Sequence, residues 1–138
     1  MTTRRTRRRL AIASLMLAGA CASAGRQPAL PQLLRIVPDS VYFLPGNVAE
    51  ITLEGSGFDQ SASAPANMVR IGPVVLNKVP SSDKGTRIRV VVPADQPSGG
   101  EAPPAPWMSG RYPITVTTPA GTTAALQLFL LVGGGLPR

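Results

Sequence analysis

The stretch Ala49-Glu-Ile-Thr-Leu-Glu54, followed directly by Gly55-Ser-Gly-Phe58, decides the fold of this chain. Apolar and polar residues alternate through its first half, so that the apolar ones share one side of an extended backbone. A period of two is typical of a strand with one buried face. The stretch therefore predicts a half-buried strand that ends at a glycine-rich bend, with a phenylalanine ring placed over the end of a core.

Six further segments indicate strands, and each is bounded by Gly, Pro, Asp or Ser: residues 34–37, 68–71, 74–79, 87–92, 112–117 and 124–131. About seven strands in roughly 100 residues is typical of an immunoglobulin-like β-sandwich. No segment after the first 20 residues has helical periodicity. The sequence therefore predicts one all-β domain over residues 33–132, followed by a flexible end at 133–138.

Several blocks in fixed order resemble the successive motifs of an IPT/TIG domain, an immunoglobulin-like fold of the E-set type. The blocks are Ile36-Val-Pro-Asp-Ser40, Pro45-Gly46, Ile51-Thr-Leu-Glu-Gly-Ser-Gly-Phe58, Val69-Arg-Ile-Gly72, Arg87-Ile-Arg-Val-Val-Val-Pro-Ala94 and Gly110-Arg-Tyr-Pro-Ile-Thr-Val-Thr-Thr-Pro-Ala-Gly121. The resemblance covers nearly the whole domain. It implies a cell-surface or extracellular adhesion or spacer unit.

Four residues have expected structural roles in such a domain. Gly55 and Gly57 bracket Ser56 where a strand ends, a place that tolerates little side-chain bulk or needs positive φ. Phe58 is expected to cover the end of the core. Tyr112 starts a strand after a turn, where its hydroxyl can bond an upstream backbone group as in a tyrosine corner.

The first 20 residues have the three parts of a secretory signal: an arginine-rich start, an apolar run over residues 10–17, and the small residues Ala18-Gly-Ala20. The apolar run is shorter than the ~20 residues of a membrane-spanning helix, which disfavours an N-terminal anchor helix. Thr6-Arg-Arg-Arg-Leu10 also resembles part of a twin-arginine signal, so two export routes stay open.

Cys21 stands directly after these small residues, and Leu17-Ala-Gly-Ala-Cys21 resembles the bacterial lipobox. The resemblance implies a diacylglycerol on Cys21, a tether over residues 21–32, and a cell-envelope or cell-surface lipoprotein, with Ala22 favouring the outer membrane. The alternative is an ordinary signal peptidase site that leaves a free thiol on a secreted or periplasmic protein.

Composition disfavours several classes of function. The net charge of +7 is concentrated in the leader, and from Cys21 onward nine basic residues face seven acidic ones, a net charge of +2. That balance argues against a nucleic-acid partner. Histidine is absent and Cys21 is the only cysteine, which argues against a zinc site, a disulfide or a histidine general base. We expect no cofactor, no metal and no enzymatic activity.

Three carboxylates, Asp39, Glu54 and Asp59, are candidates for acid–base work or calcium binding, but no dense oxygen-rich loop surrounds them. Strand ends and turns explain them better. Ser56 lacks both an elbow motif and a histidine to activate it.

The connection over residues 95–109 has about 15 residues without expected structure, longer than ordinary connections and often functional. It contains Trp107, the only tryptophan, beside Met108. Such residues are enriched at interfaces, so both are candidate contacts with a ligand or partner. The alternative is that Trp107 folds back and caps the sandwich edge.

The last predicted strand offers a second candidate surface. If Leu126, Leu128 and Leu130 face the core, Phe129 and Leu131 face outward and form a docking stripe. The opposite register would bury Phe129, and the sequence leaves this choice open. We therefore expect a non-catalytic binding module for a protein or glycan, held at a membrane by lipid. The alternative is a structural accessory lipoprotein of an envelope assembly.

Overall fold

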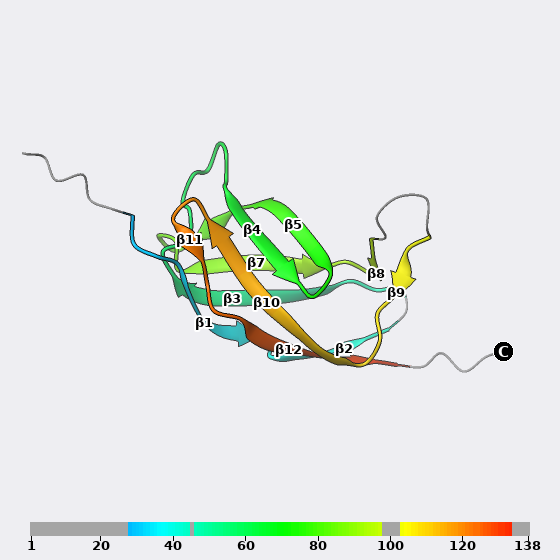
Figure 1. The fold of residues 1–138 in the computed structure, drawn as a ribbon. Helices are drawn as coiled ribbons and strands as arrows, with labels where there is room; N and C mark the ends of the chain where they lie inside the picture. The colour runs from blue at the N-terminus through cyan, green and yellow to red at the C-terminus, as the bar shows by residue number, and fades with distance from the viewer. Residues whose placement is uncertain (1–27, 45, 98–102, 134–138) are drawn as a thin grey trace, which may run out of the picture.

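The computed structural model describes residues 28–44, 46–97 and 103–133. This part of the chain is all-β and contains no helix, and its strands form two larger sheets and one small one (Figure 1). The all-β prediction is confirmed, and the arrangement is consistent with a β-sandwich. The signal peptide, Cys21 and most of the predicted tether lie outside the described residues, as do the last five residues of the predicted flexible end.

The four-stranded sheet has the order β1 (Gln32–Val37), β3 (Ala49–Ser56), β7 (Arg87–Val92) and β6 (Ser81–Ser82), and each neighbouring pair is antiparallel. The predicted facing of its central strands is confirmed. Ile51 and Leu53 of β3 and Ile88 and Val90 of β7 are buried, while the polar residues between them are exposed or half-buried.

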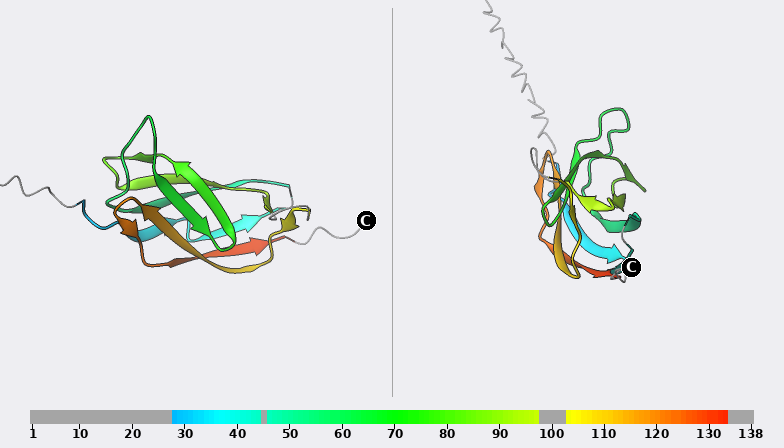
Figure 2. Two further views of the ribbon diagram at one scale, coloured as in Figure 1. Left: turned by 45° about the horizontal axis from the view of Figure 1, so that its top comes forward. Right: turned by 90° about the vertical axis from the view of Figure 1, so that its right-hand side faces the viewer.

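The second sheet runs β2 (Ser40–Phe43), β12 (Leu126–Val132), β10 (Gly110–Thr118), β4 (Asn67–Ile71) and β5 (Val74–Val79), with β11 (Gly121–Thr122) paired to β10. The strand β2 runs parallel to β12, and the other pairs are antiparallel. The end-on view in Figure 2 shows the two large sheets facing each other.

One cluster of buried side chains fills the space between the sheets. Its fully buried members come from both sheets and are mainly Val, Ile and Leu, because the chain has only three Phe, two Tyr and one Trp. The most deeply buried apolar residues are Leu53, Val69, Ile71, Ile88, Val92, Ile114, Val116, Leu128 and Leu130. The predicted period of two therefore decides which residues enter the core.

The bend after β3 matches its prediction. Gly57 has φ +72°, and a Cβ built there would lie only 3.0 Å from the carbonyl oxygen of Leu30. A Cβ at Gly55 would overlap the carbonyl oxygen of Gln32 on the neighbouring strand. Phe58 follows with a buried ring. Both glycines are therefore required by close backbone approach, and Gly57 also by its left-handed conformation.

Besides the unpredicted two-residue strands β6 and β11, two larger features differ from the predictions. The sequence does not predict β2, which begins two residues after Pro38 and pairs in the other sheet from β1. The connection over 95–109 was expected to lack structure, yet β8 (Asp95–Gln96) pairs antiparallel with β9 (Ala105–Pro106). The strands β8 and β9 have only two residues each, too few to show a period of two. The strand β2 alternates between exposed and buried residues but has only four of them, which is too short a run to stand out.

The molecule has two ends that matter for the site. At the proximal end the described chain begins at Pro28, and at the distal end β12 finishes beside the β8–β9 pair (Figure 1). At the proximal end, Pro31 is buried and β1 begins at Gln32, so the predicted tether gives way to packed structure slightly before residue 32.

Candidate functional site

Trp107 is buried at the distal end, with 3% of its surface exposed. Its indole Nε1–H donates to the carbonyl oxygen of Pro93 at 2.8 Å. Its ring meets that of Tyr112 edge to face, with centroids 4.9 Å apart and planes at 88°. The interpretation of Trp107 as an exposed contact is therefore wrong, because the indole gains more from a closed core and a satisfied N–H than from solvent. It caps the sandwich edge, as the alternative expected.

Tyr112 ties this cap to the start of β10. Its hydroxyl donates to the carbonyl oxygen of Met108 at 2.9 Å, which confirms the expected bond to an upstream backbone group. The ring is half-buried against the core. The cap, the strand and the connection before it are thereby held as one unit.

Met108 lies between these anchors, and its side chain is 71% exposed. Trp107 precedes it in the core, and Ser109 follows it, with its Oγ accepting the N–H of Val132 at 2.9 Å. The backbone around Met108 is therefore fixed on both sides while the thioether faces solvent. A flexible, polarizable side chain on a fixed backbone is well suited to contact a partner.

Phe129 faces outward in β12, together with Leu131, while Leu128 and Leu130 are fully buried. The structure thus selects the register in which the outward stripe exists. On the neighbouring strand, Tyr42 stands directly across from Leu131 and is 66% exposed. A shallow depression of about 370 Å³ lies beside Phe129 and is lined by Asp39, Ser40, Arg111 and Gln127 as well.

Exposed apolar side chains gather at the distal end. Of the nine large exposed ones among the described residues, six lie at or near this end, and we call them the distal apolar surface: Tyr42, Leu44, Val48, Val91, Met108 and Leu131. They come from the ends of β2, β7 and β12 and from the segments that lead into β3 and β10. Because these strands all terminate here, residues far apart in sequence come to the same end of the domain. Tyr42 and Leu131 are neighbours on the outer face of the six-stranded sheet, while Val91 lies on the outer face of the four-stranded sheet.

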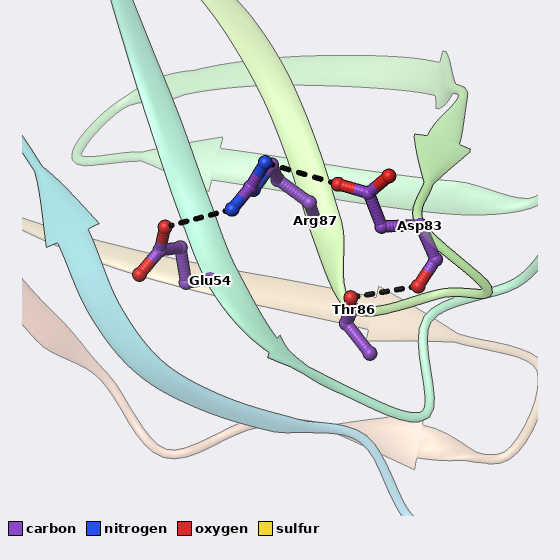
Figure 3. Close-up of polar contacts among 4 residues, drawn as sticks. All are labelled: Glu54, Asp83, Thr86 and Arg87. Atoms are coloured by element: carbon purple, nitrogen blue, oxygen red, sulfur yellow. Dashed lines mark hydrogen bonds and ion pairs between the residues drawn. The ribbon is translucent and has the colours of Figure 1, made fainter.

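The outer face of the four-stranded sheet has the opposite character. Arg87 lies between Glu54 and Asp83, at 3.4 Å and 3.0 Å, and the Thr86 hydroxyl donates to the carbonyl of Asp83 (Figure 3). Arg89 pairs with Glu50 at 3.1 Å. These partners are at least a third exposed, so the pairs contribute little stability. Two arginines and three carboxylates, all exposed in part, make this face a solvated one.

The candidate carboxylates have structural surroundings. Glu54 belongs to the ion pairs above, and Asp59 accepts the backbone N–H of Ala66 at 2.9 Å, which closes its own loop. Within residues 28–44, 46–97 and 103–133, no three carboxylates or other metal-binding side chains come together. Asp59 therefore closes a turn, and Glu54 belongs to an ion-paired strand.

Asn67 is a residue that the sequence reasoning missed. It is fully buried at the start of β4. Its amide donates to the carbonyl oxygens of Asp59 and Val79, both at 2.9 Å, and its oxygen accepts the N–H of Asp59 at 2.7 Å. This side chain joins the loop after β3 to the end of β5. A single Asn in a polar loop carries no periodic signal that could have revealed it.

The predicted lipid site, Cys21, is outside the described residues. Within the part of the chain that is described, no helix has the length and apolar character needed to cross a membrane.

Comparisons with known proteins add no relative. No family model matches the chain, and neither curated proteins nor solved structures include a match. The IPT/TIG resemblance therefore stays a prediction that depends on the sequence blocks.

Proposed function

We propose that this chain is a non-catalytic interaction module of the IPT/TIG type that is exported, held at a membrane by a lipid on Cys21, and binds a partner protein through its distal apolar surface. The observation that carries the proposal is the gathering of six exposed apolar side chains at one end of the domain. Exposed apolar side chains that gather on one part of a soluble domain mark interaction sites.

The strand order supports the immunoglobulin-like part of the proposal. An immunoglobulin constant-type domain has strands A-B-E-D in one sheet and C-F-G in the other. Here the corresponding orders are β1-β3-β7-β6 and β4-β10-β12. If β1, β3, β4, β6, β7, β10 and β12 are labelled A to G in chain order, they occupy the same places in the two sheets as the immunoglobulin strands of those letters. Random pairing of seven strands would rarely produce this match.

The contrast between surfaces supports a protein partner. The outer face of the four-stranded sheet is covered by exposed ion pairs that satisfy each other. The distal end instead exposes Tyr42, Met108 and Leu131, and aromatic and Met side chains are enriched in interface cores. Polar groups beside Phe129, including Arg111 and Gln127, supply the rim that such an interface needs.

Site-specific photo-crosslinking of the full chain in an exporting bacterial host tests the proposal. A photoreactive residue in place of Met108 is expected to trap a discrete partner protein, and one in place of Arg89, which is exposed on the ion-paired face, is expected to trap none.

With that partner purified, Met108→Ala should weaken binding about thirtyfold, which corresponds to the ~2 kcal/mol of a hot spot, and Arg89→Ala should leave binding unchanged. Equal trapping at both positions would show that the distal surface is not a binding site, and binding to glycans without any trapped protein would show that the partner class is wrong.

The membrane attachment has a test of its own. Cys21→Ser removes the acceptor thiol, so the protein should move from the membrane fraction into the soluble fraction of the same host. The physical reason is that two acyl chains anchor a protein stably while a bare polypeptide has no comparable apolar surface. Mass spectrometry of the unsubstituted protein should show the diacylglycerol adduct. An unmodified thiol would contradict lipidation and leave the interaction proposal standing.

A further inference from the structure

The strand β2 forms one edge of the six-stranded sheet, and no other described strand pairs with its outer side. The carbonyl oxygens of Asp39 and Phe43 accept N–H groups of Phe129 and Gly133 on the β12 side, both at 2.9 Å. Backbone groups alternate in direction along a strand. Those of Ser40 and Tyr42 therefore point away from β12, and within the described residues no other strand pairs with them.

The other terminal strands have features that discourage pairing. In β1 the register shifts at Leu34, and in β5 it shifts near Lys78, which has φ +56°. The strand β6 has only two residues. Bulges, lysines and short length are the usual protection of sheet edges. The strand β2 is also short, but its register with β12 is regular, and residues 40–44 contain no charge and no proline.

We propose that β2 strands of two copies of this chain pair antiparallel, about a two-fold axis at Tyr42, and join two domains through one continuous sheet. In this register Tyr42 faces Tyr42 of the second copy, and Ser40 faces Leu44. Tyr42 and its copy exchange two N–H···O bonds from the groups that point away from β12. Leu44 follows the end of β2 and its carbonyl oxygen already accepts the N–H of Asn47 at 3.0 Å, so its N–H is the group that bonds to the Ser40 carbonyl oxygen. The contact is isologous, so it closes at two copies.

A second copy fits this edge better than an unstructured peptide for two reasons. The strand is already extended in the folded domain, so pairing orders little additional backbone. Because residues 40–44 are uncharged, self-pairing sets no like charges against each other. The pairing also brings Tyr42 and Leu44 of both copies to the same side, next to Leu131, and so makes one larger apolar surface. The proposed pairing of β2 strands does not depend on whether that apolar surface binds a further partner.

The register predicts which positions approach each other. Facing residues in an antiparallel pair have Cα atoms about 5.5 Å apart, within the range that a disulfide spans. Leu131 lies one strand further in, so its two copies would be about 15 Å apart, because each strand adds ~4.8 Å on either side. Ser40 would be displaced from its own copy along the strand by a similar distance.

Cysteine cross-linking of the purified full chain under mild oxidation tests the register. Tyr42→Cys should form a disulfide-linked dimer at least tenfold faster than Ser40→Cys or Leu131→Cys, and a mixture of Ser40→Cys with Leu44→Cys should also link. The unsubstituted chain controls for Cys21. If Leu131→Cys links faster than Tyr42→Cys, the copies pack face to face and edge pairing is wrong.

Sedimentation of the full chain over a range of concentrations supplies the second measurement, and a dimer is expected. Tyr42→Pro removes the outward N–H without removing a bond to β12, which proline tolerates on an edge strand, and should weaken the dimer at least tenfold. Tyr42→Ala keeps that N–H and should weaken it less. A chain that stays monomeric at all concentrations, with Tyr42→Cys no faster than the controls, overturns the proposal even if Tyr42→Pro fails to fold.

Discussion

Replacing Trp107 by alanine is expected to lower the free energy of unfolding by about 3 to 5 kcal/mol, the usual cost of removing a buried aromatic ring. The indole is almost fully buried, packs edge to face on Tyr112, and donates to the Pro93 carbonyl. Its loss leaves a cavity and an unpaired carbonyl at once. Urea denaturation of the variant and the unsubstituted protein measures the difference.

Trp107→Phe is the matched control, because it keeps an aromatic ring and removes the indole N–H. It should cost less, with about 1 kcal/mol from the lost hydrogen bond. Met108→Ala, whose side chain is largely exposed, should change the free energy of unfolding by less than about 0.5 kcal/mol. If Trp107→Ala unfolds at the same urea concentration as the unsubstituted protein, the cap does not form in solution.

Asn67→Asp is the second substitution with a large expected effect, again about 3 to 5 kcal/mol of lost stability, which is the cost of an uncompensated buried charge. The Asn67 amide donates to the Asp59 and Val79 carbonyls. Aspartate would place a carboxylate oxygen against those two carbonyl oxygens with no donor between them. Thermal or urea unfolding near neutral pH measures the loss.

The same change at an exposed position separates charge from burial. Asn77 lies on β5 close to this cluster in sequence and is exposed. Asn77→Asp should alter stability by no more than about 0.5 kcal/mol. If both variants lose the same stability, the effect comes from the added negative charge on the domain and not from the buried amide network.

Alternation of apolar and polar residues determined most of the fold. Ile51 and Leu53 in β3, and Ile88, Val90 and Val92 in β7, are all buried as their spacing predicts. Successive side chains of a strand point to opposite faces, so a strand with one buried face has an apolar residue at every second position. The alternation in the sequence therefore predicts directly which side chains are buried. The bend at Gly57 could also be predicted from the sequence, because a glycine at a strand end indicates a backbone conformation that other residues adopt only with strain.

The candidate site could be predicted only in part from the sequence. The sequence pointed to Trp107, Met108 and Phe129 as unusual apolar residues, but it could not assign their environments. A tryptophan in a proline-rich connection can point either way, and only the nearby Pro93 carbonyl and Tyr112 ring turn it inward. The facing of Phe129 was equally undecided, since shifting a strand by one residue exchanges its two faces.

The sequence by itself therefore determined the class of fold, the core positions and the glycine bend, because these depend on local spacing. Tertiary structure alone decided the pairing of β2 with β12, the burial of Trp107 and the three bonds of Asn67. It also decided that Tyr42, Leu44, Met108 and Leu131 lie at the same end of the domain. Each of these depends on groups brought together from distant parts of the chain, and local spacing carries no information about which distant groups will meet.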